Sequence, residues 1–106
     1  MEYTGNEEHS ISLLDASELT KNYRDQFDEE TSYIKGEYFG KTALQSLLSQ
    51  TDCVGARIYY GLKASGTPCL VIVGVDGDGN DITTGEIMEF GALCPTHCSE
   101  NNELNS

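Results

Sequence analysis

The sequence predicts an α+β domain in which two N-terminal helices pack on a small antiparallel sheet of three or more strands. Three observations predict this fold. Apolar residues recur at helical spacing in the first half of the chain, two β-rich runs follow at residues 56–62 and 69–75, and the polar segment between these runs has the length of a hairpin turn. With 106 residues, the chain is as long as one ordinary domain.

The two ends of the chain differ from its middle in composition. Residues 1–11 are polar and acidic without periodicity, which predicts a flexible N-terminal arm. Residues 99–106 have the composition of a disordered acidic tail. We therefore expect residues 12–98 to form a single folded domain.

The first predicted helix begins at Asp15. Asp15 and Glu18 have the spacing of a capping box, in which a short acceptor side chain is followed three residues later by a Glu. The acidic residues 28–30 mark the expected end of this helix, because negative charge at a helix C-terminus opposes the helix dipole. Apolar and aromatic residues share one face of the helix: Ala16, Leu19, Tyr23 and Phe27.

Residues 31–40 are interpreted as a connector, because their two glycines disfavour a long helix. Their three aromatic side chains, Tyr33, Tyr38 and Phe39, are expected to pack on the core. A second helix is predicted at residues 41–50. Its apolar residues form the stripe of an amphipathic helix: Ala43, Leu44, Leu47 and Leu48.

The hairpin is the part of the chain around which the rest is expected to be organised. Side chains of its first strand alternate between an apolar face and a mixed face that carries Arg57 and Tyr59. Residues 70–75 are almost continuously apolar, which is typical of a strand buried on both faces. A third strand is predicted within residues 82–90. The apolar face of the first strand consists of Ala56, Ile58, Tyr60 and Leu62.

The chain is strongly acidic, with 6 Lys and Arg against 18 Asp and Glu and a formal net charge of −12. Nucleic-acid binding and attachment to anionic membranes both depend on basic residues, so we expect neither partner. No basic region followed by an apolar run marks a targeting segment, and no apolar run approaches the roughly 20 residues of a transmembrane helix. We expect a cytoplasmic protein with its four cysteines reduced.

The acidic turn after the second strand is one candidate metal site. Asp76, Asp78 and Asn80 place oxygen ligands at alternate positions, as Ca²⁺ requires, and Asp81 adds a further carboxylate. The turn departs from an EF-hand, because Asp81 stands where that motif has glycine and Ile87 where it has glutamate. The alternative interpretation is a polar hairpin turn, since Asp, Asn and Gly are the ordinary turn residues.

The cysteine segment near the C-terminus is the second candidate. Cys94, His97 and Cys98 supply two or three ligands of the kind that Zn²⁺ prefers, and further ligands would have to come from elsewhere. A disulfide between Cys94 and Cys98 is the second interpretation, if the protein meets an oxidising compartment. The third interpretation gives the segment no special role.

Arg57 and Tyr59 form the third candidate, a ligand-binding pair. An Arg beside a Tyr can recognise a carboxylate or stack on a ring. The same two residues can equally be a cross-strand pair on a solvated sheet face.

Enzymatic chemistry finds little support in this sequence. The chain has only His9 and His97, one near each end, for a nucleophile–histidine arrangement. It has no glycine-rich phosphate loop of a known type. We therefore favour a protein without enzymatic activity and without a required cofactor.

Four segments carry a resemblance to known sequences. RIYYG at 57–61, LVIVGVD at 70–76, GND at 79–81 and CPTHC at 94–98 occur in this order. In these segments the chain resembles a group of small bacterial proteins of unknown function. The resemblance implies that hairpin, acidic turn and cysteine segment form one unit, and it implies no activity.

Together these features predict a small acidic binding or assembly module that self-associates as a homodimer. A small sheet leaves edges and apolar faces that a second copy can cover. The alternative is a metal-binding protein, with Ca²⁺ at the acidic turn or Zn²⁺ at the cysteine segment.

Overall fold

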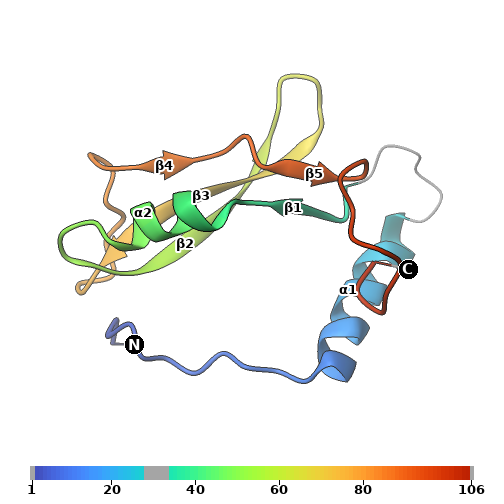
Figure 1. Cartoon of the computed structure of the whole chain (residues 1–106), viewed down its shortest axis with the longest axis horizontal. Helices are drawn as coiled ribbons and strands as arrows, with labels where there is room; N and C mark the ends of the chain where they lie inside the picture. The colour runs from blue at the N-terminus through green and yellow to red at the C-terminus, as the bar shows by residue number, and fades with distance from the viewer. Residues whose placement is uncertain (1, 28–33, 106) are drawn as a thin grey trace.

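The computed structural model of the chain describes residues 2–27 and 34–105. These residues form two antiparallel sheets, one of two strands in the order β1-β5 and one of three strands in the order β2-β3-β4 (Figure 1). In chain order the elements are α1 (Leu13–Phe27), β1 (Gly36–Tyr38), α2 (Lys41–Leu48), β2 (Cys53–Leu62), β3 (Pro68–Asp76), β4 (Ile87–Met88) and β5 (Ala92–Cys94).

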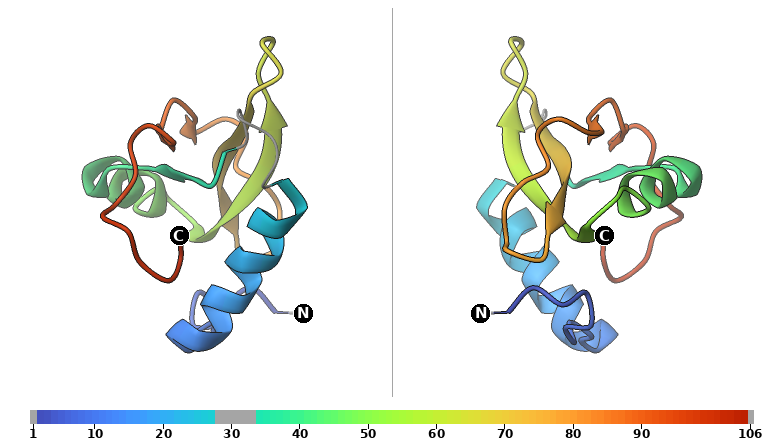
Figure 2. Two further views of the ribbon diagram at one scale, coloured as in Figure 1. Left: turned by 90° about the vertical axis from the view of Figure 1, so that its right-hand side faces the viewer. Right: turned by 90° about the vertical axis from the view of Figure 1, so that its left-hand side faces the viewer.

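The chain is therefore a mixture of helices and antiparallel strands, but the predicted arrangement with both helices packed on one sheet is wrong. α2 lies against β2 and β3, whereas α1 lies to one side of both sheets, near the C-terminal segment (Figures 1 and 2). The apolar residues of α1 do not cover a sheet. Most of them are exposed: Leu13, Leu14, Leu19 and Tyr23.

The first helix begins one turn earlier than predicted. The Ser12 hydroxyl accepts a hydrogen bond of 3.0 Å from the Asp15 N–H, so Ser12 and not Asp15 caps the helix. Ser12, like Asp15, is a short acceptor followed three residues later by an acid, so the same spacing occurs twice in this stretch. The predicted helix end at 28–30, and Tyr33 of the predicted connector, lie outside the described residues.

The second helix agrees with the prediction except at its end, which comes at Leu48 instead of residue 50. Leu47 is fully buried. The Gln50 side chain donates a hydrogen bond of 2.8 Å to the Leu47 carbonyl and accepts one of 2.8 Å from the Glu86 N–H. Gln50 thus connects the end of α2 with the turn before β4.

The predicted hairpin is confirmed. β2 and β3 pair in antiparallel register from Leu62 opposite Pro68 to Cys53 opposite Asp76, with a bulge between Cys53 and Gly55. The turn of this hairpin projects beyond the rest of the molecule (Figure 2). β3 is the central strand of its sheet, and it is covered on both faces as predicted. Its buried residues Ile72, Val73 and Val75 are each 4% exposed.

The remaining strands are short. The predicted third strand is reduced to the two residues of β4, which pair with β3 at Ile72 and Val73. β1 falls in the segment interpreted as a connector, and β5 runs into the cysteine segment; the two strands pair from Gly36 opposite Cys94 to Tyr38 opposite Ala92. Strands of two or three residues carry no clear alternation, so sequence patterning does not reveal them.

Both chain ends contact the folded elements. The arm that precedes α1 passes the start of β2, where a side chain at Gly5 would come within 2.7 Å of the Val54 carbonyl oxygen. Near the other end, Arg24 of α1 donates a hydrogen bond of 2.8 Å to the Leu104 carbonyl. The predicted boundaries of arm, domain and tail stay predictions.

Candidate functional site

β2 is the longest strand of the described residues, and it lies at the edge of its sheet. β2 pairs with β3 on one side, and no other strand of the described residues pairs with it. A strand edge exposes backbone N–H and C=O groups that a further strand can bind. Only those residues of β2 whose backbone N–H and C=O groups point away from β3 can bind such a strand.

Two hydrogen bonds of β3 settle this orientation. The Leu70 N–H donates to Glu37 at 2.8 Å, and the Gly74 carbonyl accepts from the Ile82 N–H at 2.8 Å. Both bonds are made on the side of β3 that faces away from β2. Residues opposite one another in an antiparallel pair turn their backbone groups either towards each other or both away.

The residues opposite Leu70 and Gly74 are Tyr60 and Ala56. Their N–H and C=O groups consequently face away from β3, and those of Ile58 between them do the same by alternation. Arg57 and Tyr59 instead direct their backbone groups to β3. Among residues 2–27 and 34–105, no strand pairs with the outward backbone groups of β2, which occur at every second residue.

The side chains along this edge are apolar and exposed. Ile58 is 53% exposed, Tyr60 94% and Leu62 72%, although the alternation makes them the apolar face of the strand. Tyr60 also lines a pocket together with Leu19 and Tyr23 of α1. Edge strands of soluble proteins are usually protected by Lys, Pro or a covering segment, and β2 contains neither Lys nor Pro.

The single charged residue of β2, Arg57, is held by the acidic turn. Arg57 Nη1 lies 2.5 Å from Asp81 Oδ1 and donates to the Gly79 carbonyl at 3.2 Å. The Tyr59 hydroxyl donates to the other Asp81 oxygen at 2.5 Å. The predicted carboxylate-binding pair therefore binds a carboxylate of its own chain, which fastens the turn after β3 to β2.

This arrangement shifts the pKa of all three groups. The hydrogen bond from Tyr59, followed by the bond and charge of Arg57, holds the pKa of Asp81 below its ordinary value. The bond to Asp81 raises the pKa of Arg57 and is also the main cause that raises the pKa of Tyr59. Each group therefore keeps its ordinary charge state at neutral pH.

We expect the free energy of unfolding of the Asp81→Asn variant to fall less on acidification than that of the wild type. A carboxyl group whose pKa is lowered by folding stabilises the fold above its unfolded pKa, and this stabilisation is lost as pH falls through the folded value. The relevant range lies below pH ~4, the ordinary value of Asp. Urea denaturation between pH 3 and 7 measures this, with Asp78→Asn as the control of equal charge change in the same turn. Parallel pH profiles for wild type and Asp81→Asn would contradict the expectation.

The acidic turn itself is closed by hydrogen bonds to Asp76. Its Oδ1 accepts from the N–H groups of Asp78 and Asn80, both at 3.0 Å, and its carbonyl accepts from the Gly79 N–H at 2.9 Å. Gly79 has a φ of 84°, which glycine adopts readily. One side-chain oxygen of Asp76, the first of the predicted Ca²⁺ ligands, thus accepts hydrogen bonds from the backbone of the turn itself.

No group of three or more His, Cys, Asp or Glu side chains in residues 2–27 and 34–105 is arranged to hold a metal ion. The turn residues and the cysteine segment lie on different sheets, since the turn follows β3 and the segment begins at the last residue of β5. Calcium or zinc binding stays a prediction.

The cysteine segment contains a disulfide. Cys94 and Cys98 are joined, with their Cα atoms 4.7 Å apart, and Cys53 and Cys69 are free and half-buried. This corresponds to the second of the three interpretations of the segment and differs from the expectation of four reduced thiols. The backbone N–H of His97 donates to the Leu93 carbonyl at 2.9 Å, and its side chain is exposed.

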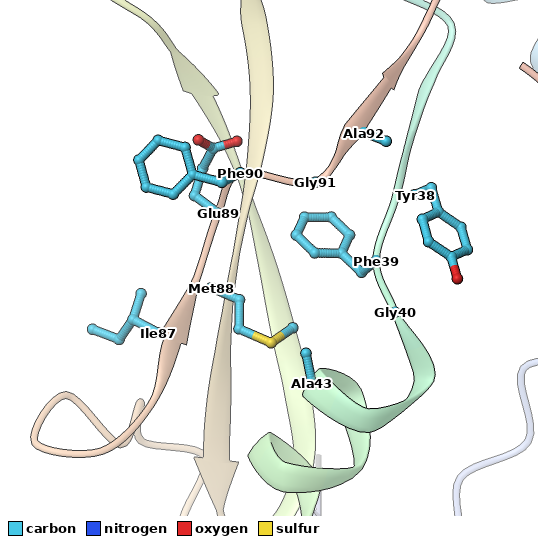
Figure 3. Close-up of a pocket in the computed structure, with 10 residues that line it drawn as sticks. All are labelled: Tyr38, Phe39, Gly40, Ala43, Ile87, Met88, Glu89, Phe90, Gly91 and Ala92. Atoms are coloured by element: carbon cyan, nitrogen blue, oxygen red, sulfur yellow. The ribbon is translucent and has the colours of Figure 1, made fainter. Parts of the chain in front are cut away.

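A groove of about 550 Å³ lies where the two sheets meet. Figure 3 shows Phe39, Met88 and Ala43 gathered at its centre, with Tyr38 turned away from them. Glu89 and Phe90 lie at the opposite side, on the connection from β4 to β5. None of these residues was predicted to form a site, because the groove is formed by segments that are distant in the chain.

Comparisons with protein-family models, with curated proteins and with solved structures each find no match to this chain. The resemblance of its second half to small bacterial proteins therefore stays a prediction. Within the described parts of the chain, no helix has both the length and the apolar character that crossing a membrane requires.

Proposed function

We propose that this chain is an assembly module that associates with a second copy through the outer edge of β2. The observation that carries the proposal is the orientation of that edge. Unpaired backbone groups at Ala56, Ile58 and Tyr60 lie in one row beside exposed apolar side chains. An antiparallel strand from a second copy would satisfy the backbone groups and cover the side chains in one step.

The accessible surface of the chain is large enough for part of it to be buried against a second copy. Its accessible surface is 7718 Å², whereas a compact monomer of this mass exposes about 5,800 Å². The difference of roughly 1,900 Å² exceeds the roughly 800 Å² that each partner buries in a standard interface. The radius of gyration, 15.4 Å, likewise exceeds the value of about 13 Å for a compact domain of this length.

The charge of β2 is compatible with association in an acidic protein. A net charge of −12 makes two copies repel one another. β2 contains no acidic residue, and its Arg57 is already paired with Asp81. Association through β2 therefore brings together two strands without acidic residues, while repulsion between the remaining parts of the two chains opposes it.

This balance predicts that salt strengthens self-association. Screening weakens the repulsion between the acidic surfaces and leaves backbone pairing and apolar burial in place. Light scattering after size-exclusion chromatography, at several protein concentrations in 0.05 and 0.5 M NaCl, measures the effect. We expect the mass to approach twice that of one chain, at lower protein concentration in the higher salt. A monomer at high micromolar concentration in both salts would overturn the proposal.

A further inference from the structure

A pair of carboxyl groups lies at the junction of the two sheets. Glu37 belongs to β1, and Glu89 follows β4. Glu37 Oε1 accepts the N–H of Leu70 on β3 at 2.8 Å, so its side chain reaches from one sheet to the other. Gly91 makes room for it, because a side chain at that position would come within 2.7 Å of Glu37 Cγ.

One oxygen of each carboxyl group is buried and has no hydrogen-bond partner among the described residues: Glu37 Oε2 and Glu89 Oε1. A buried carboxylate oxygen without a donor is unfavourable, and two ionised carboxylates side by side repel each other. A single proton removes both problems, since a protonated carboxyl group donates an O–H bond to its neighbour.

We propose that Glu37 and Glu89 share one proton, and that the resulting O–H···O bond fastens the two-stranded sheet to the edge of β3. Glu37 is the protonated partner and donates to Glu89, while its Oε1 continues to accept from Leu70. The device makes the junction between the sheets, and the groove beside it, sensitive to pH.

The surroundings of the two carboxyl groups place the proton on Glu37. Burial, followed by the bond and charge of Glu89, raises the pKa of Glu37. The pKa of Glu89 is lowered, chiefly by a hydrogen bond from the Phe90 N–H, then by the hydrogen bond with Glu37, and last by the positive charge of Lys63 in the hairpin turn. A raised pKa on one carboxyl group and a lowered pKa on its neighbour are expected when the two groups hold one proton between them.

Two other cations lie near the pair. Arg24 and Lys35 line the pocket beside Glu37, on the side of α1. Both donate to the C-terminal segment, to the carbonyl oxygens of Leu104 and Asn105 respectively, each at 2.8 Å. Lys63 is the cation that contributes to the protonation of the pair.

The sign of the pH effect follows from Glu37. A carboxyl group whose pKa is raised by folding stabilises the fold fully below its unfolded pKa, and the stabilisation is lost as pH rises through the folded value. Above that value the two carboxylates repel each other across the junction. We therefore expect the contacts between β1, β5 and the edge of β3 to loosen as pH rises from the ordinary Glu range towards neutrality.

The test is a titration of the side-chain carboxyl carbons by NMR, carried out at concentrations where the chain is monomeric. We expect Glu37 to titrate at higher pH than the ordinary value of Glu. In Glu89→Gln the like charge is gone and the amide can donate to Glu37, so the Glu37 midpoint should move to lower pH. A Glu37 midpoint in the ordinary range, or one unchanged by Glu89→Gln, would overturn the proposal.

A second measurement does not require assignment of the carboxyl signals. Glu37→Gln keeps an acceptor for Leu70 and a donor for Glu89 at every pH, so it imitates the protonated state. The unfolding equilibrium constant of the wild type, divided by that of Glu37→Gln, should rise with pH. The control Glu18→Gln removes the same charge from an exposed position and should not reproduce this rise. A flat ratio for Glu37→Gln would contradict the shared proton, whether or not the chain self-associates.

Discussion

Ile58→Pro is expected to abolish self-association and to leave the hairpin folded. The N–H of Ile58 faces away from β3, so proline removes a donor that only an added strand would use. In a two-fold dimer the substitution acts twice, and each copy loses a hydrogen bond and part of the apolar contact. Losses of about 1 kcal/mol per hydrogen bond and about 2 kcal/mol per side chain correspond to a Kd at least about 100-fold higher.

Two further variants show whether the effect depends on the orientation of the edge. Ile58→Thr keeps the N–H and a β-branched side chain, so it should weaken association less than proline does. Tyr59→Pro lies one residue further on, where the N–H faces β3, and should destabilise the hairpin itself. Light scattering and circular dichroism separate the two effects. Undiminished association of a folded Ile58→Pro variant would contradict the proposed interface.

Leu47→Ala is expected to cause the largest loss of stability among single substitutions in α2. Leu47 is 0% exposed and, among the described residues, shares the fully covered apolar core with only Ile72, Val73 and Val75 of β3. Removing a buried Leu side chain typically lowers the free energy of unfolding by about 2–5 kcal/mol, because contacts are lost and a cavity remains. A small domain has little stability to spare, so a substantial unfolded fraction should appear.

Leu48→Ala is the matched control for this prediction. It lies next to Leu47 in the same helix and loses the same atoms, but it is 48% exposed. Its expected loss is below about 1.5 kcal/mol, because less apolar surface returns to water and no closed cavity forms. Urea denaturation of both variants measures the difference. Equal losses would show that the core is not centred on the contact between α2 and β3.

The local pattern of residues predicted the hairpin and α2 well. A continuous apolar run between turn residues indicates a strand covered on both faces, and Ile72, Val73 and Val75 of β3 are buried. The position of α1 was not predictable in the same way. Its stripe of apolar residues indicates a helix but does not identify the surface that the stripe contacts, and Leu19 remains exposed.

Features that depend on long-range pairing were also missed. β1 and β5 have three residues each, and their pairing joins segments from opposite halves of the chain. Strand order decides that β2 is an edge strand, and no local pattern reports strand order. For the same reason Arg57 and Asp81 were assigned to separate candidate sites, although register brings them within 2.5 Å of each other.

Amide hydrogen exchange along β2, followed by NMR at low and high protein concentration, tests the proposed interface most directly. The amides of Arg57 and Tyr59 face β3 and should be protected at both concentrations. The amides of Ala56, Ile58 and Tyr60 face outward; we expect them to exchange rapidly at low concentration and to become protected at high concentration. Rapid exchange of these three amides at every concentration, or protection that does not change with concentration, would contradict association through the edge of β2.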